Sequence, residues 1–254
     1  MRISISSYRY QSVDHHDEEI SRLLLELAEK HPAYGFAKLF HLIRNLDHKW
    51  NRKRIHRIYC ALSLNIRRKG KKRLPNRHPQ PLGIPACENI SWSMDFMSDA
   101  LSNGRRFRTF NIIDDYSREI LAIEIDLSLP TKRIIRVLDR LVEYRGCPKK
   151  IRMDNGPEFI SVHLADWAER NGISLEFIQP GRPMQNGYIE RFNRSYRTEI
   201  LDRYLFRTLD EVRSLTADWM IEYNEIRPHE SLGNLPPKAF LKKKQGKVSN
   251  LTCY

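Results

Sequence analysis

The order of apolar segments between residues 91 and 192 is the feature that most constrains how this 254-residue chain can fold. Three strand-like segments come first, and Gly104 marks the turn between the first two. Helical and strand-like segments then alternate. The strands are expected at 91–97, 107–113, 120–126, 150–153 and 174–178, and the helices at about 131–144, at 163–171 and around Glu190. This order predicts a mixed sheet covered by helices, with an antiparallel meander at its start.

Three strands followed by alternating helices and strands match the ribonuclease-H-like fold, an α/β fold whose mixed five-stranded sheet is flanked by helices. In that fold the first and fourth strands lie side by side. Asp95 lies in the first expected strand, and Asp154 lies at the end of the fourth. The fold would therefore bring these two carboxylates together although 58 residues separate them.

A third acid completes a candidate active site. Asp154 comes at a strand end, directly before an Asn-Gly-Pro turn. Glu190 falls in the first turn of a helix that Asn186 or Gly187 can cap. With Asp95, these side chains give three hard oxygen ligands suited to Mg²⁺ or Mn²⁺. Two such ions would relieve the repulsion between the carboxylates and clamp the attacking and leaving oxygens of a phosphoryl displacement.

Other polar residues in the same region have competing interpretations. Glu158 could replace Glu190 as the third ligand, but its place directly after a proline is typical of a helix start, so Glu190 is preferred. Asn155 is expected to orient the preceding aspartate or a bound phosphate. Asp114 and Asp115 could bind metal, although an Asp-Asp pair before Tyr-Ser is more typical of a hydrogen-bonded turn.

The positive charge is concentrated at one end of the chain. The net charge is +13, and residues 1–85 hold 18 Lys and Arg against seven Asp and Glu, which gives +11. Lys and Arg neutralise phosphates, so nucleic acid is the expected partner of residues 1–85, and double-stranded DNA in particular. A basic protein that binds no polyanion is the alternative.

Three short helices are expected within residues 1–85, at 18–30, at about 36–46 and after Asn51, which can cap the third. Such a set is typical of a helix-turn-helix module, while the alternative is a small bundle with a solvated basic face. The third helix carries candidate DNA contacts at Arg52, Lys53, Arg54 and Arg57. The proline-rich linker that follows can track a phosphate backbone with Arg67, Arg68, Lys69, Lys71, Lys72 and Arg73.

The helix that carries Glu190 offers further candidate DNA contacts. Asn193, Arg194 and Arg197 lie three, four and seven positions after Glu190 and so share its face. For Arg197 a solvated surface position is the alternative. A last amphipathic helix is expected at 209–226. The sequence thus predicts four segments, a helix-turn-helix-like domain at 1–65, a linker at 66–85, a catalytic core at 86–205 and a helical extension at 206–254.

Several function classes find little support. The four cysteines form no Cys-x-x-Cys pair, and the N-terminus has no apolar signal core, so an intracellular chain with reduced thiols is expected. The apolar runs are all shorter than the roughly 18 residues that a membrane span requires. The histidines lack the paired spacing of a structural zinc module. A DNA-binding protein of the cytoplasm, associated with the nucleoid, fits these observations.

The ordered motifs resemble one protein family. They are Tyr34-Gly35, 51–59, Trp92-Ser-Met-Asp95-Phe, Asp114-Asp-Tyr-Ser-Arg118, Asp154-Asn-Gly-Pro-Glu158-Phe, Pro183-Met-Gln-Asn-Gly-Tyr-Ile-Glu190-Arg-Phe-Asn193 and Tyr223-Asn-Glu-Ile-Arg-Pro-His229. Together they resemble OrfB, the second-frame product of insertion sequences split into OrfA and OrfB, within the transposase and retroviral integrase superfamily. Asp95, Asp154 and Glu190, with 35 residues between the last two, resemble its Asp-Asp-Glu triad. The chain departs from the family at Phe36-Ala37-Lys38, where a more basic run is usual, and at Gly187, where alanine is commoner.

The resemblance implies a reaction and a set of partners. Water would cleave at the element's ends to free a 3′-OH, which would then attack target DNA. OrfA would join the chain as a frameshift fusion or partner, and the transposase would oligomerise on DNA. A covalent Tyr or Ser recombinase is the rival mechanism, but no such residue is paired with an activating base. A DNA-binding regulator that has lost catalysis is a second hypothesis for the function, and a structure-specific nuclease of the same fold is a third.

Overall fold

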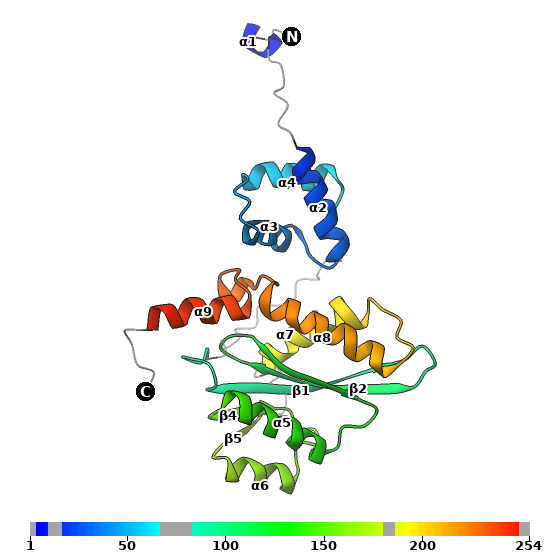
Figure 1. Ribbon diagram of the computed structural model, residues 1–254, viewed down its shortest axis with the longest axis vertical. Coiled ribbons are helices and arrows are strands. Elements are labelled where there is room, and N and C mark those ends of the chain that lie inside the picture. The colour runs from blue at the N-terminus through cyan, green and yellow to red at the C-terminus, as the bar shows by residue number, and fades with distance from the viewer. Residues whose placement is uncertain (1–3, 10–16, 67–82, 180–185, 249–254) are drawn as a thin grey trace. The chain divides into compact units, whose positions relative to one another are not determined.

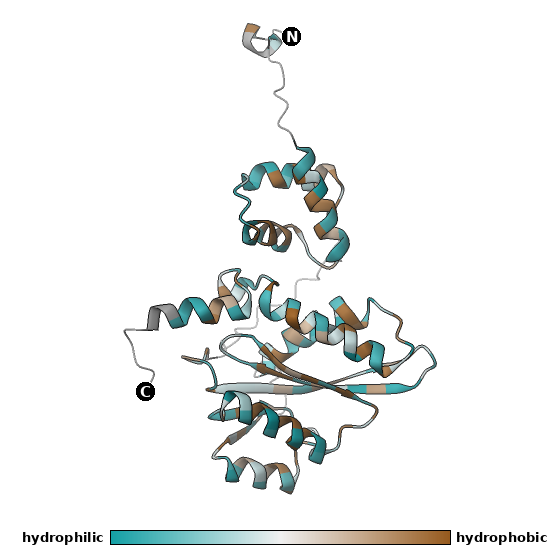
Figure 2. Ribbon diagram, in the orientation of Figure 1, coloured by the Kyte–Doolittle hydropathy of each residue, from teal (hydrophilic) through white to brown (hydrophobic). Residues whose placement is uncertain are grey.

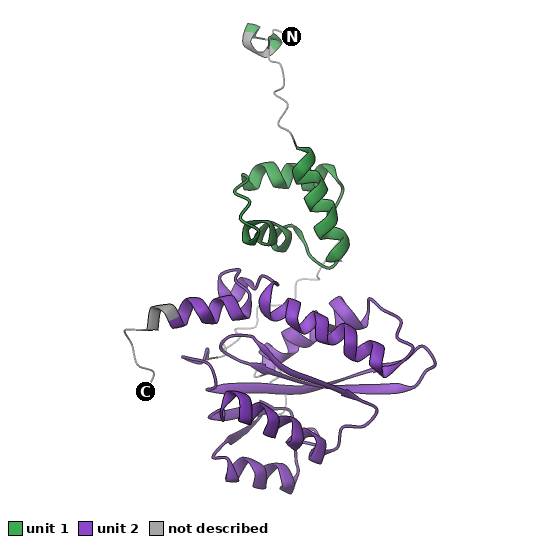
Figure 3. Cartoon of the chain, in the orientation of Figure 1, with its two compact units in different colours: residues 1–71 green, residues 72–254 purple. Residues whose placement is uncertain are grey.

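The structure is a computed structural model that describes residues 4–9, 17–66, 83–179 and 186–248. It separates into two compact units, residues 1–71 and residues 72–254 (Figure 3). Most of the predicted linker lies outside the described residues. The division into four segments therefore stays a prediction, and each unit is described by itself.

The first unit is helical, as predicted. Its helices are α1 (Ile5–Tyr8), α2 (Glu18–Lys30), α3 (Phe36–Asn45) and α4 (Arg52–Ala61). Asn51 caps α4, because its side-chain oxygen accepts a 2.8 Å hydrogen bond from the backbone nitrogen of Lys53. Buried apolar side chains from α2, α3 and α4, among them Leu24, Leu39 and Ile55, form one core. The short helix α1 was not expected from the sequence.

A five-stranded mixed sheet is the centre of the second unit. Its strands are β1 (Ser91–Ala100), β2 (Arg106–Asp114), β3 (Ile120–Asp126), β4 (Lys150–Met153) and β5 (Ser174–Phe177). Their spatial order is β3-β2-β1-β4-β5, with β1, β2 and β3 antiparallel and β1, β4 and β5 parallel. This sheet confirms the predicted ribonuclease-H-like fold, including the pairing of the first strand with the fourth.

Helices cover both faces of the sheet (Figure 1). On one face lie α5 (Thr131–Arg145) and α6 (Val162–Arg170), and on the other lie α7 (Gly187–Tyr196) and α8 (Leu209–Glu225). Thr208 and Glu211 form a capping box at the start of α8. A further helix, α9 (Pro237–Val248), follows it inside the predicted helical extension, where the sequence placed no second helix.

Each face of the sheet has its own hydrophobic core, and hydrophobic residues run along the strands between them (Figure 2). Trp92, Phe110 and Ile151 belong to the core under α5 and α6. The opposite core packs α7 and α8 against the sheet. Its members are Leu101, Phe107, Ile113, Ile120, Ile125, Ile189, Phe192, Tyr196, Ile200, Leu201, Phe206, Val212, Trp219 and Tyr223. This second core, the α7–α8 core, draws residues from both sides of position 205, where the sequence predicted a boundary.

Two further features concern helices. A π-helical turn, Arg197–Leu201, continues α7. In the described part of the chain, none of the helices combines the length and the apolar character needed to cross a lipid bilayer.

Candidate active site

The sheet register and α7 bring three carboxylates to one place. In the parallel pair of β1 and β4, Ser93 lies opposite Arg152, and Asp95 and Asp154 each follow two positions further along their own segments, Asp154 directly after the end of β4. Glu190 lies in the first turn of α7, and α7 packs against β1 and β2. Asn186 occupies the position before this helix, but its side chain makes no capping hydrogen bond there. The local backbone of α7 therefore presents Glu190 without the expected side-chain cap.

Asp95 is the electrostatic centre of this group. The pKa of Asp95 is raised to about 6: burial is the largest cause, the negative charges of Asp154 and Glu190 add to it, and hydrogen bonds from Phe96 and Asn193 oppose it. The charges of Asp154 and Glu190 make the potential at this buried carboxyl group more negative. Such a potential attracts cations.

A pair of asparagines holds Asp95 in place. The side-chain amide of Asn193 donates a 2.7 Å hydrogen bond to Oδ2 of Asp95, and the backbone nitrogen of Phe96 donates one of 2.8 Å to Oδ1. The amide of Asn111, which lies opposite Asp95 on β2, donates a 2.8 Å hydrogen bond to Oδ1 of Asn193. Asn111 thereby fixes the orientation of the Asn193 amide, with its NH₂ group towards the carboxylate. Asn193 was predicted to contact DNA, whereas its side chain is engaged inside the carboxylate group.

Asp154 is held by the turn that follows it. The backbone nitrogen of Gly156 donates a 3.0 Å hydrogen bond to Oδ1 of Asp154. Asn155, predicted to orient Asp154 or a phosphate, instead donates its side-chain amide to the carbonyl oxygen of Ile178 at 3.0 Å. The orienting group is thus the backbone amide of Gly156 and not the side chain of Asn155.

Glu158 does not join the three acids. It lies in a turn at 157–159, so its interpretation as a helix start was wrong, and α6 begins only after Ser161. The guanidinium of Arg108 binds the Glu158 carboxylate and holds the pKa of that group below its usual value. Arg108 also lies 4.2 Å from the centre of the Phe96 ring. Glu158 is neutralised by its own arginine, whereas the charge of Glu190 acts on Asp95.

The three carboxylates suit a hard divalent cation by their chemistry, but they are not gathered into a closed cluster. Among the residues that the structure describes, no group of three or more His, Cys, Asp and Glu side chains is arranged to hold a metal ion. Both oxygens of Asp95 and one oxygen of Asp154 accept hydrogen bonds from protein donors. Mutual repulsion separates like charges that have no counter-charge between them. Carboxylate oxygens are nonetheless the ligands that Mg²⁺ and Mn²⁺ prefer, so the donor set fits.

Asp114 and Asp115 form a hydrogen-bonded structure, as preferred from the sequence. Asp114 accepts hydrogen bonds from the backbone nitrogens of Tyr116 and Ser117 and from the backbone nitrogen of Asn89. Asp115 is fully buried, and the hydroxyl groups of two β1 serines and the guanidinium of Arg152 donate to it. Burial raises the pKa of Asp115, and these donors oppose the shift. Both aspartates therefore stabilise the end of β2.

Further along α7 the predicted DNA contacts differ from one another. Arg194 is exposed. Arg197 donates to Oδ2 of Asp99 at 3.1 Å and to the carbonyl oxygen of Ser98 at 2.8 Å, so it joins the helix to the end of β1. The Arg197 side chain is 37% exposed, yet the protein itself engages its guanidinium.

The motif at 223–229 is connected to the end of α7 by a buried ion pair. Glu199 and Arg227 are both buried, with their closest atoms 2.7 Å apart. The indole nitrogen of Trp219 donates to Glu199 at 3.0 Å, and Arg227 also donates to the hydroxyl group of Ser195 at 3.0 Å. These contacts connect the segment after α8 to the π-helical turn that continues the helix of Glu190.

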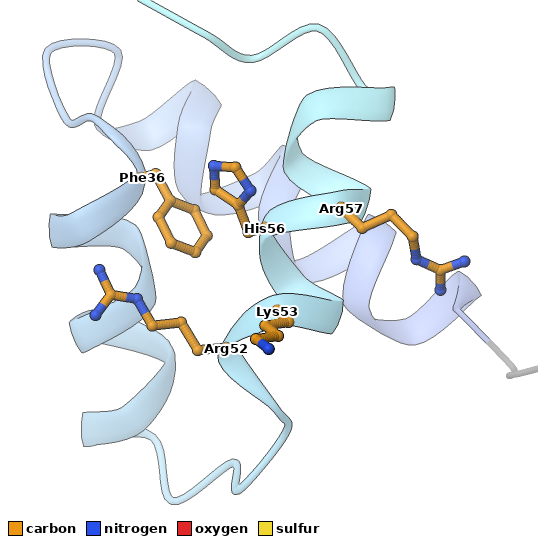
Figure 4. Close-up of a pocket in the computed structure, with 5 residues that line it drawn as sticks. All are labelled: Phe36, Arg52, Lys53, His56 and Arg57. Carbon is orange, nitrogen blue, oxygen red and sulfur yellow. The ribbon is translucent and has the colours of Figure 1, made fainter.

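The candidate DNA contacts in the first unit lie on α4. Two of them, Arg54 and Arg57, bind the carboxylate of Asp17. Arg52 and Lys53 line a cavity of about 330 Å³ together with Phe36, His56 and Arg57 (Figure 4). The linker candidates Arg67, Arg68, Lys69, Lys71, Lys72 and Arg73 lie outside the described residues.

Sequence reasoning missed the groups that position the acids. Asn111 is one of these positioning groups, and an amide side chain in the middle of the apolar strand at 107–113 could have pointed to it. Arg108 was another, and it alternates with apolar neighbours in the same strand. Asp17 gave no signal, because its pairing with Arg54 depends on how two helices pack.

Three family models match the chain. Two models described as integrase core domain match residues 85–183 and residues 171–237, and a model described as HTH-like domain matches residues 15–72. Together they cover both compact units.

Individual proteins are similar over most of the chain. The chain is 40% identical over 230 residues to the "Insertion element IS407 uncharacterized 31.7 kDa protein" of Burkholderia multivorans (strain ATCC 17616 / 249), across 91% of this chain and 83% of that protein. It is 39% identical over 223 residues to the "Insertion element IS476 uncharacterized 39.2 kDa protein" of Xanthomonas euvesicatoria, across 88% of this chain and 64% of that protein. The structure of the HTLV-2 integrase catalytic core domain in complex with magnesium is 18% identical, with a TM-score of 0.48, across 59% of this chain and 95% of that chain.

The sheet topology and the integrase core matches define the class, which is the superfamily of transposases and retroviral integrases. Within that class, the chain belongs to the OrfB-type transposases of insertion sequences whose reading frames are split into OrfA and OrfB.

Proposed function

We propose that this chain is the catalytic subunit of a DNA transposase, which cleaves DNA at the ends of its insertion sequence and transfers the resulting 3′-OH into target DNA. The observation that carries the proposal is the grouping of three carboxylates, in which the negative charges of Asp154 and Glu190 both act on the buried Asp95. Phosphoryl transfer needs positive charge at that position to bind and activate a polyanionic substrate.

In this proposal Asp95, Asp154 and Glu190 hold two Mg²⁺ or Mn²⁺ ions. When bound, these ions supply the Lewis acidity that polarises the scissile phosphodiester and lowers the pKa of the attacking group. Asn193 and the backbone nitrogen of Gly156 orient two of the carboxylates through the hydrogen bonds described above. Asn155 and Glu158 support the loop beside them, and no side chain of the protein acts as a covalent nucleophile.

DNA binding is divided between the units. The HTH-like first unit and the basic segment after it would neutralise phosphates of duplex DNA, and Arg194 would contact the strand near the active site. Two element ends require two active sites, so the chain is proposed to oligomerise on DNA. OrfA, as a fusion or a partner, would add recognition of the terminal repeats, and the complex would work on the bacterial nucleoid.

A strand-transfer assay tests the catalytic proposal. The full chain, alone and fused to OrfA, is incubated with labelled duplexes that carry the element's terminal repeats, a target plasmid and Mg²⁺ or Mn²⁺. We expect cleaved and joined products that disappear in Asp95→Asn, Asp154→Asn and Glu190→Gln, with rate losses on the order of 10³-fold or more. DNA binding should survive in all three variants.

Glu158→Gln is the matched control, because it removes a nearby carboxylate that is paired with Arg108. It should keep most of the activity. An inactive Glu158→Gln beside an active Glu190→Gln would transfer the third ligand to Glu158. Cleavage without joining would favour a nuclease, and DNA binding without either reaction would favour a regulator.

A further inference from the structure

The basic side chains of α4 fall into two groups that differ in how they are paired. The carboxylate of Asp17, at the start of α2, binds Nε of Arg54 at 2.8 Å and Nη2 of Arg57 at 2.6 Å. The side chains of Asp17 and Arg54 are each 31% exposed, and that of Arg57 is 58% exposed. One acid thus neutralises half of the positive charge that two arginines bring to this side of α4.

Arg52 and Lys53, in the first turn of α4, differ from these two arginines in their pairing. Among the residues that the structure describes, neither Arg52 nor Lys53 forms an ion pair, and both are exposed. The guanidinium of Arg52 lies 5.8 Å from the centre of the Phe36 ring and 5.4 Å from that of Phe40. Stacking on two rings of α3 restricts this long side chain before any ligand binds, which lowers the entropy cost of a contact.

A cavity joins these groups. It has a volume of about 330 Å³ and is lined by Phe36, Arg52, Lys53, His56 and Arg57. The imidazole of His56 meets the Phe36 ring edge to face, with the ring centres 4.6 Å apart. Figure 4 shows Phe36, Arg52, Lys53 and His56 grouped between α3 and α4, whereas the Arg57 side chain extends away from them.

We propose that the first unit contacts the phosphate backbone of duplex DNA through this cavity surface, formed by Phe36, Arg52, Lys53 and His56, and that Asp17 is an internal counter-charge that withholds Arg54 and Arg57 from DNA. A DNA phosphate at Arg54 would have to replace a carboxylate that already fills the same role, so it gains little there. A phosphate at Arg52 and Lys53 meets two cations that no acid of the described residues neutralises. The inference rests on the proposed function, since it specifies which surface of the HTH-like unit carries DNA binding.

Salt-dependent DNA binding of the full chain tests the inference. Each phosphate contact that is lost lowers the slope of log affinity against log salt by about 0.9. The probe is a fluorescently labelled duplex of unrelated sequence, measured by anisotropy over a salt series, with Arg52→Gln and Lys53→Gln compared against Arg54→Gln. All three variants remove one positive charge from the same helix. We expect the first two to lose about 0.9 in slope each, and Arg54→Gln to keep the wild-type slope.

Asp17→Asn tests the counter-charge in the opposite direction. It releases two arginines, so binding should become tighter by about threefold or more, with a steeper salt dependence. Because Asp17→Asn also weakens a contact between the start of α2 and α4, thermal unfolding of each variant is recorded. Asp17→Glu, which keeps the charge, should restore wild-type binding.

Equal losses in Arg52→Gln and Arg54→Gln, or an unchanged affinity in a folded Asp17→Asn variant, would overturn the inference while leaving the proposed function intact. A wild-type chain that bound no duplex DNA would overturn both.

Discussion

Asn193 on α7 donates a 2.7 Å hydrogen bond to Asp95 on β1, across 98 positions of sequence. It joins the helix that carries one candidate catalytic acid to the strand that carries another. Because Asn111 binds the other end of the same amide, the three side chains form a short chain of hydrogen bonds from β2 through α7 to β1. Their geometry makes the position of Asp95 depend on residues that carry no charge.

The asparagine chain predicts coupled losses of activity. Asn193→Ala should slow cleavage by about 10- to 100-fold, the usual effect of removing a group that orients a metal ligand. Asn111→Leu should also slow it, since Asn193 could then turn its oxygen towards the carboxylate. The double variant should be no slower than Asn193→Ala, because both changes act on the same hydrogen bond. Single-turnover cleavage rates measure this, and additive losses would show that Asn111 acts by another route.

Asp95 should destabilise the metal-free protein at neutral pH. Its pKa of about 6 in the folded state is above the ordinary value of 3.8, so its favourable contribution is present below about pH 4 and is lost as pH rises through 6. Asp95→Asn should therefore raise the free energy of unfolding at pH 7.5, by about 1–3 kcal/mol. The gain should shrink as the pH falls to 5. Urea unfolding in the presence of a chelator measures it.

Glu158→Gln is the control of opposite sign for that experiment. In the unchanged protein, Arg108 lowers the pKa of the Glu158 carboxyl group. The stabilising contribution of Glu158 is therefore present above its ordinary pKa of 4.5, and it is lost as the pH falls through the lower folded-state value. Removing this charge should lower the free energy of unfolding at pH 7.5. If both variants shifted stability in the same direction, the negative potential at Asp95 would be in question.

Gly156 should be sensitive to a single methyl group. A Cβ added there would lie 3.1 Å from Oδ1 of Asp154, closer than an ordinary van der Waals contact. Gly156→Ala should displace that carboxylate and slow cleavage by about tenfold or more, because small misplacements at a reacting centre are costly. Gly83→Ala is the control, since a Cβ at that glycine meets nothing within 4 Å. Equal rates for the two variants would mean that the loop accommodates the methyl group.

The buried pair of Glu199 and Arg227 should be important for stability. Arg227→Met leaves a buried carboxylate without its partner, which costs about 3–5 kcal/mol. Adding Glu199→Gln should restore a large part of the loss, because the glutamine oxygen can still accept the hydrogen bond from Trp219. The urea midpoint of the second unit measures this. A double variant as unstable as Arg227→Met would point to packing instead of charge.

The sequence predicted most elements of the fold because their apolar residues recur with the period of a strand or a helix. Strand β3 and helix α2 begin and end where they were expected, at Ile120–Asp126 and Glu18–Lys30. The three acids could be named from their places on such elements. α9 was missed, since its composition around Lys242-Lys-Lys244 is too polar to give a helical period.

The pairing of side chains could not be predicted in the same way. Periodicity reports which face of an element is buried, but not which residue of a distant element lies opposite. Arg197 binds Asp99 and Asn155 binds Ile178 because of strand register and helix rotation, which only the folded chain determines. The same holds for Asp17, whose partner Arg54 is 37 positions away.

The α7–α8 core has a consequence for the gene. One cluster of buried side chains joins the two helices: it contains Val212, Trp219 and Tyr223 together with Ile189 and Phe192, which lie on either side of Glu190 in the sequence. A nonsense mutation soon after codon 205 would spare every candidate catalytic codon and yet leave the helix of Glu190 without its cover. Among decayed copies of such an element, stop codons between positions 205 and 223 should therefore be as silencing as the loss of an active-site acid.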